Sequence, residues 1–148
     1  MPFKNILVPT DLSETSLRAI RRAVELARSS GGTITLLHVG ILPYVYSTDM
    51  GFAQPVGPLF VQASEQAARE QRHNLERTAR QEIPETISHR VVVREGYPPQ
   101  EILDQVTAGQ HDLIVMGTHG RTGLKRALLG SVAERVIRES TVPVLVVP

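Results

Sequence analysis

The sequence predicts an α/β protein in which helices cover both faces of a parallel sheet, and two patterns indicate this class. Short apolar runs alternate along the chain with segments of helical periodicity, as in strands joined by crossover helices. The run at residues 6–8 is apolar without alternation, which is typical of a strand buried on both faces of a sheet. Because the chain has 148 residues, we expect one domain over residues 1–148.

Local signals mark the ends of the predicted elements. The first helix has an apolar stripe and stops at Gly31-Gly32. Prolines at positions 98 and 99 open a later helix that ends at Gly109. The predicted strands cover residues 3–9, 33–39, 91–93, 113–116 and 142–147, and the predicted helices cover residues 13–30, 61–81, 98–109 and 132–139.

Residues 40–60 do not fit this alternation. The segment contains three prolines and three glycines together with several large apolar side chains. Loops of this length inside compact domains are usually functional or disordered. A flap over a ligand and a contact between subunits are both open interpretations of this segment.

The composition excludes several classes of function. Sixteen Lys and Arg residues balance fifteen Asp and Glu residues, for a formal charge of +1, so we expect no nucleic-acid partner. Cysteine is absent, which excludes disulfides, thiolate metal sites and thiol nucleophiles. No apolar run is long enough to cross a membrane, and the N-terminus lacks a signal-peptide pattern. We therefore expect a cytoplasmic protein with no membrane partner.

A glycine motif follows the fourth predicted strand. Gly117 and Gly120 are followed after nine residues by Gly130 and Ser131, in the spacing G-x-x-G-x9-G-[ST]. Glycine lets the main chain approach an anion closely, and the free amides of a helix's first turn favour phosphate. We interpret the motif as a phosphate site; the alternative is that the glycines only form turns.

Other residues of this loop have rival interpretations. Ser131 and Glu134 have the spacing of a capping box, which would satisfy the helix amides without a ligand, although a hydroxyl that caps the empty site can also face phosphate. Val132 offers the next backbone amide. No lysine follows Gly130, so Lys125 and Arg126 are the expected cations of the loop.

Asp11 lies just past the first predicted strand, three residues before Glu14. This spacing is also a capping pattern, and capping of the helix is one interpretation. In the other, the carboxylate accepts hydrogen bonds from ribose hydroxyls or holds a Mg2+ ion. The five histidines show no close ligand spacing and predict no metal site.

These motifs resemble the universal stress protein family. The resemblance rests on the opening Ile-Leu-Val-Pro-Thr-Asp at residues 6–11, the glycine loop, the Gly-Ser-Val-Ala-Glu run at 130–134, and Gly96, Pro98 and Ile102 in the pattern G-x-P-x-x-x-I. It implies a Rossmann-like open five-stranded parallel sheet of order 3-2-1-4-5, and membership of the subgroup that binds ATP. The expected function is a nucleotide-dependent regulatory switch in stress response. The alternatives are a protein-interaction module that ignores nucleotide and a slow ATP hydrolase, although no residue is an obvious base for hydrolysis.

The resemblance also implies where ATP lies. Adenine is expected against Val39, ribose near Asp11 and the phosphates in the loop from Gly117 to Ser131, with Mg2+ as an accompanying ion. Open α/β sheets bind ligands beyond the carboxyl ends of strands where the connections diverge, here the first and fourth strands. The expected nucleotide-binding residues are Pro9, Thr10, Asp11, Val39, Met116, Gly117, Thr118, His119, Gly120, Arg121, Lys125, Gly130, Ser131 and Val132.

The last predicted strand, from Val142 to Val147, is too apolar for a bare sheet edge. Two copies pairing antiparallel about a two-fold axis would bury it, and members of the family often dimerise in this way. We therefore expect a homodimer. Pro143 lacks an amide donor, so it should lie near the start of the strand or face away from the pairing.

Overall fold

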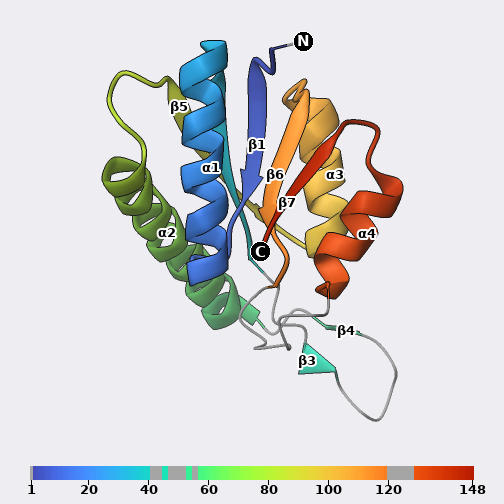
Figure 1. The fold of residues 1–148 in the computed structure, drawn as a ribbon. Coiled ribbons are helices and arrows are strands. Elements are labelled where there is room, and N and C mark those ends of the chain that lie inside the picture. Colours follow the sequence, from blue (N-terminus) through green and yellow to red (C-terminus); the bar gives the residue numbers. More distant parts are fainter. Residues whose placement is uncertain (1, 41–44, 47–52, 55–56, 120–128) are drawn as a thin grey trace.

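The computed structural model describes residues 2–40, 45–46, 53–54, 57–119 and 129–148. Its main sheet has five parallel strands in the order β5-β2-β1-β6-β7 (Figure 1). In the sequence order of these five strands this is 3-2-1-4-5, so the predicted topology is confirmed. The strands are β1 (Asn5–Pro9), β2 (Thr33–Gly40), β5 (His89–Glu95), β6 (Leu113–Gly117) and β7 (Val144–Val147).

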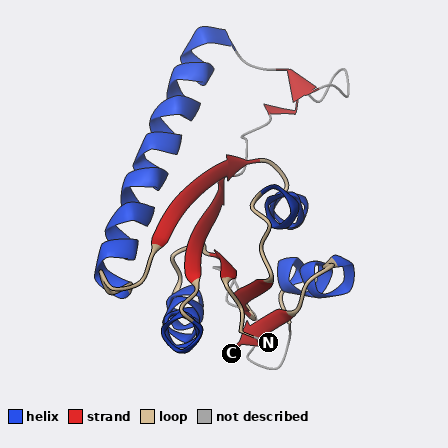
Figure 2. Ribbon diagram, turned by 90° about the horizontal axis from the view of Figure 1, so that it is seen from above, coloured by secondary structure: helices blue, strands red, loops and turns tan. Residues whose placement is uncertain are grey.

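Helices lie on both faces of this sheet, as the sequence predicts. Helices α1 (Glu14–Ser30) and α2 (Gly57–Glu82) cover one face, and α3 (Pro98–Ala108) and α4 (Ser131–Glu139) cover the other (Figures 1 and 2). Figure 2 also shows that the N-terminal part of α2 extends beyond the sheet. None of the helices, within the residues described, is long and apolar enough to cross a membrane.

Alternate side chains of the central strands fill two separate cores. Ile6 and Val8 of β1 belong to the cluster beneath α1 and α2, whereas Leu7 belongs to the cluster beneath α3 and α4. All three are fully buried. This explains why the strand is apolar without alternation, since both of its faces are covered.

The glycine of the G-x-P-x-x-x-I pattern has a structural role. Gly96 has a φ of 147°, and a Cβ added there would lie 2.7 Å from Oε1 of Glu101. Only glycine adopts this conformation without strain. The side chain of Glu101 pairs instead with Arg94 of β5 over 2.7 Å, which ties α3 to the strand before it.

Some element boundaries differ from the prediction. The last strand begins at Val144, because the hydroxyl of Ser140 bonds both to the amide of Val142, at 3.1 Å, and to its carbonyl oxygen, at 2.7 Å. Pro143 immediately precedes the strand, as predicted. Helix α2 begins at Gly57, four residues before the predicted start at Val61, and Pro58 fits its first turn.

A small antiparallel pair of strands was missed by the sequence analysis. Strands β3 (Val45–Tyr46) and β4 (Ala53–Gln54) form a two-stranded sheet within the segment expected to be a loop. Each strand has two residues, too few for a period-2 pattern to be visible.

Candidate functional site

The connections of two neighbouring strands diverge at the centre of the sheet. Strand β1 pairs with β6, with Ile6 opposite Leu113 and Leu7 opposite Ile114. The chain leaves β1 through α1 on one face and leaves β6 towards α4 on the other (Figure 1). Because parallel strands end at the same edge of a sheet, Thr10 and the residues after β6 lie at this edge, the position at which open α/β sheets bind ligands.

A dense hydrogen-bond network holds the turn after β1. The amide of Thr10 donates to the carbonyl oxygen of Leu37 over 2.8 Å. The hydroxyl of Thr10 accepts from the amide of Leu12 over 3.0 Å. Leu12 has a φ of 66°, an uncommon conformation for a residue other than glycine, and such strain persists only where the surrounding structure fixes it.

The carboxylate of Asp11 is also held in place. Its Oδ1 accepts from the hydroxyl of Ser16 over 2.6 Å and from the amide of Ser13 over 3.0 Å. The N-cap of α1 is Ser13, whose side chain accepts from the amide of Ser16. The alternative in which Asp11 caps the helix with Glu14 is therefore wrong, because Asp11 lies two residues before the cap and supports it. The sequence analysis did not single out Ser16.

The N-terminus of α4 begins at a glycine, which has no side chain to cap the helix. Gly130 is the N-cap residue, and among the described residues no side chain bonds to the helix start. The alternative of a capping box is wrong: Ser131 is exposed within the first turn, and Glu134 pairs with Arg138 over 3.3 Å. The first-turn amides, beginning at Ser131 and Val132, therefore carry the partial positive charge of the helix with no described side chain to satisfy them.

The two described glycines of the motif are required by the packing of the protein itself. A Cβ at Gly117 would lie 2.6 Å from Cγ2 of Thr15, and a Cβ at Gly130 would lie 2.9 Å from the carbonyl oxygen of Thr118. Both glycines thus satisfy the turn interpretation. Their presence does not discriminate between a turn and a phosphate site, so the case for a ligand depends on the helix amides.

Three predicted site residues meet in one hydrophobic cluster of the core. Met116 is buried in the cluster beneath α3 and α4, and Val39 and Val132 pack against the same cluster. These three side chains come from β2, β6 and α4. The structure thus brings together residues that the sequence assigned to the adenine and phosphate parts of one site. Pro9, at the end of β1, is buried.

The remaining predicted site residues divide into two groups. The hydroxyl of Thr118 and Nδ1 of His119 lie 2.8 Å apart, and Nε2 of His119 is buried with no hydrogen-bond partner among the described residues. Gly120, Arg121 and Lys125 lie outside the described residues. Within the part of the chain that is described, no three His, Asp or Glu side chains group as metal ligands.

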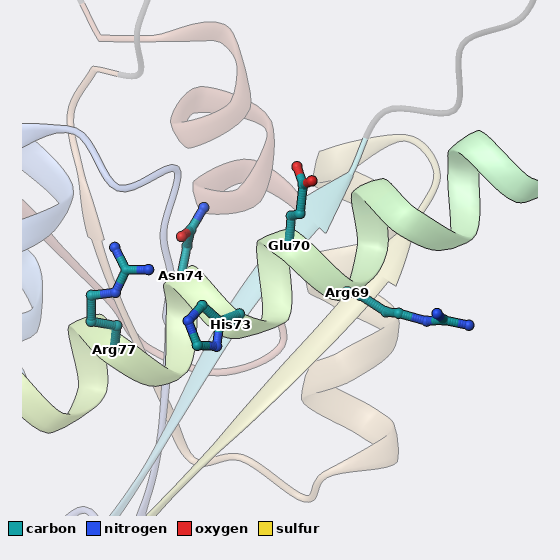
Figure 3. A pocket seen from close by; sticks show the side chains of 5 residues that line it. All are labelled: Arg69, Glu70, His73, Asn74 and Arg77. Carbon is teal, nitrogen blue, oxygen red and sulfur yellow. The ribbon is translucent and has the colours of Figure 1, made fainter.

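A shallow hollow on α2 is separate from these residues. It is lined by the exposed side chains of one helix, which leave the backbone in different directions (Figure 3). Side chains that do not converge cannot enclose a ligand, so we assign no site to this surface. The lining residues are Arg69, Glu70, His73, Asn74 and Arg77.

The topology and the diverging connections define a Rossmann-like α/β domain. This chain belongs to the universal stress protein family, whose sequence model matches residues 2–148. Universal stress protein MJ0531 of Methanocaldococcus jannaschii is 35% identical to it over 146 residues, which cover 98% of this chain and 82% of the relative. Universal stress protein MJ0577 of the same organism is 33% identical over 154 residues, covering 98% of this chain and 94% of the relative.

Solved structures agree with this assignment. The structure of MJ0577 superposes with a TM-score of 0.83 at 30% identity, covering 99% of this chain and 96% of the other. A universal stress protein solved in complex with cAMP superposes with a TM-score of 0.64 at 24% identity, covering 99% and 98% of the two chains. At this lower identity the likeness shows the fold.

Proposed function

We propose that this protein binds ATP at the edge of the sheet between β1 and β6 and acts as a nucleotide-dependent regulatory switch in stress response. The phosphates lie at the N-terminus of α4, the ribose near Asp11 and the adenine against Val39. The observation that carries the proposal is the first turn of α4, which no described side chain caps and which lies beside the carboxyl ends of the two central strands.

The comparison with the other helices supports this placement. The first turn of α1 is capped by Ser13. Helix α3 starts with Pro98 and Pro99, which have no amide hydrogen to offer an anion. Helix α4 differs from α1 in having no described side-chain cap, and from α3 in having no proline in its first turn. Its first-turn amides can therefore face an anion, and amides in this position bind phosphate oxygens.

The chemistry of the surrounding residues agrees with an adenine nucleotide. The partly buried apolar side chain of Val39 suits an aromatic base. The fixed carboxylate of Asp11 suits ribose hydroxyls or, less directly, a Mg2+ ion that accompanies the phosphates. The universal stress protein solved with cAMP holds a ligand of this class. We propose a cytoplasmic location, in keeping with a soluble nucleotide.

An amide-detected NMR titration tests the proposal. Adding ATP to 15N-labelled protein should shift the amide signals of Ser131, Val132 and Ala133 more than those of Glu14 and Thr15, which begin the capped helix α1. Shifts confined to other parts of the chain, or no shifts at millimolar ATP, would show that α4 does not receive the phosphates.

We also propose that two copies pair through β7. This strand is at the end of the sheet order, and its Leu145 is 37% exposed, while Ile137 of the adjacent helix α4 is 42% exposed. An apolar edge strand of this kind invites pairing with another chain. An antiparallel pair of β7 strands would extend the sheet across the two-fold axis.

A further inference from the structure

The side chain of His38 contacts the turn that carries Asp11. Its Nδ1 lies 3.0 Å from the carbonyl oxygen of Thr10. A carbonyl oxygen only accepts hydrogen bonds, so Nδ1 must carry a proton and donate. In the neutral ring this assigns the proton to Nδ1 and leaves Nε2 without one. The sequence analysis found no role for this histidine.

The bond fixes one half of the peptide unit between Thr10 and Asp11. The other half of the same unit, the amide of Asp11, donates to the hydroxyl of Ser16 over 3.3 Å. That hydroxyl in turn donates to the carboxylate of Asp11 over 2.6 Å. The Thr10–Asp11 peptide is therefore held on one side by His38 of β2 and on the other by Ser16 of α1. The orientation of this peptide fixes the direction in which the Asp11 side chain leaves the backbone.

The turn needs such support because it contains a strained residue. Leu12 has a φ of 66°, and its side chain packs against the cluster beneath α1 and α2. A residue other than glycine is strained in this region of backbone space and stays there only if other contacts hold it. The bond from His38 is one of those contacts.

We infer that His38 is a positioning residue for nucleotide binding: by donating from Nδ1 to the carbonyl of Thr10, it holds the Thr10–Asp11 peptide so that the Asp11 carboxylate meets the ribose. This inference rests on the proposed function, since it needs Asp11 to face a ribose. It gives His38 a role that requires no contact with the ligand.

Two substitutions separate this role from general packing. His38→Asn keeps an N–H group at the position of Nδ1, whereas His38→Leu has a similar size and no donor. We expect His38→Leu to bind ATP about tenfold more weakly, and His38→Asn to stay within about threefold of the wild type. AMP should show the same relative losses as ATP, because the ribose contact is common to both. Calorimetric titration of each variant measures these affinities.

Two results would overturn the inference: equal losses in the leucine and asparagine variants, or no loss in a folded His38→Leu protein. If His38→Leu does not fold, His38→Gln replaces it, because its amide group extends one methylene further than Nδ1; the expected loss is again about tenfold.

A measurement without nucleotide separates this inference from the proposed function. The 15N spectrum of the neutral imidazole should show the proton of His38 on Nδ1, and the Asp11 amide should exchange faster in His38→Leu than in His38→Asn. A proton on Nε2, or equal exchange in both variants, would refute the positioning role even if ATP binds. If these two results hold and the wild type binds no nucleotide, the proposed function fails, and with it the link from His38 to a ligand.

Discussion

The amide of Gly130 donates a hydrogen bond of 2.7 Å to the carbonyl oxygen of Thr118. This bond joins the residue before α4 to the residue after β6, so the start of the helix is held at the carboxyl end of the strand. The carbonyl of Gly130 accepts from Glu134 as the first bond of the helix. No side chain in the described part of the chain caps the amides between these two residues, and they form the phosphate-binding surface that we propose.

Substitution of Gly130 is expected to destabilise the protein. A Cβ there would lie 2.9 Å from the carbonyl oxygen of Thr118, so Gly130→Ala should lower the free energy of unfolding by about 2 kcal/mol, as overpacking does. Denaturant unfolding measures the change. Ser131→Ala is the control, because Ser131 is exposed and caps nothing; it should change stability by less than about 0.5 kcal/mol. Equal stability of the two variants would contradict the tight packing at Gly130.

Two variants distinguish the structural role of Asp11 in the turn after β1 from its proposed role in binding ribose. Asp11→Asn keeps an oxygen that accepts from Ser13 and Ser16, so we expect its stability to stay within about 1 kcal/mol of the wild type. Its nucleotide affinity should fall, because the charge that strengthens bonds to ribose hydroxyls is lost.

Asp11→Ala removes the oxygen that accepts both of these hydrogen bonds and should also lose about 2 kcal/mol of stability. Thermal unfolding and ATP titration of both variants test this separation. Full ATP affinity in Asp11→Asn would argue against any contact between the carboxylate charge and the ligand.

Acid should destabilise the protein through His111. This side chain is 4% exposed, and burial lowers its pKa below the ordinary value of 6.5. Three smaller effects act on the same pKa: a hydrogen bond with the backbone of Asn5 raises it, the charge of Arg90 lowers it and the charge of Asp112 raises it. The side chain of Gln105, from α3, lies next to the ring. Above pH 6.5 the ring is neutral in both folded and unfolded chains, so the stability is complete there.

As the pH falls below 6.5, the unfolded chain takes up a proton that the folded protein resists. The free energy of unfolding should then decrease, by at most about 1.4 kcal/mol per pH unit for this one group, until the folded pKa is reached. Urea unfolding between pH 5 and 7 measures the slope. His111→Leu should flatten it, whereas His73→Gln, on the exposed face of α2, should leave it unchanged. A steeper dependence of the unfolding free energy on pH in His111→Leu would show that His111 is not the source of the acid destabilisation.

The proposed dimer predicts the effect of a charge on β7. Leu145→Lys should produce monomers, because lysine on an edge strand opposes pairing with another chain. Sedimentation or light scattering at matched concentrations gives the mass. Thr141→Lys adds the same charge just outside the strand and should remain dimeric. A monomeric wild-type protein would refute the proposed dimer and would leave the proposed nucleotide site untouched.

The sequence predicted a parallel sheet with helices on both faces from its alternating apolar and helical segments, and it predicted the strand order through its resemblance to the universal stress protein family. It missed the pair β3–β4, whose strands are too short for periodicity, and it extended the last strand to Val142. At Val142 the amide and the carbonyl oxygen bond to the hydroxyl of Ser140 and not to a neighbouring strand. Local side-chain bonds of this kind compete with regular structure and are invisible to a pattern of apolar residues.

The candidate site was predicted in outline and corrected in detail. The strand order implied by the family resemblance placed Asp11 and Gly117 at one edge of the sheet, but residue spacing suggested capping patterns at Asp11 and at Ser131 that the structure does not contain. The cap of α1 is Ser13, and α4 begins with an uncapped glycine. The role of His38 could not be inferred, because its bond to Thr10 joins residues that are distant in sequence and depends on the register of β1 with β2.

Calorimetric titration of nucleotide-free protein with Mg·ATP measures directly whether the protein binds nucleotide. We expect saturable heat with a dissociation constant in roughly the micromolar range, which corresponds to a binding free energy of about −8 kcal/mol, and weaker binding by Asp11→Asn. Absence of heat up to millimolar ATP, in protein shown to carry no nucleotide from purification, would contradict it.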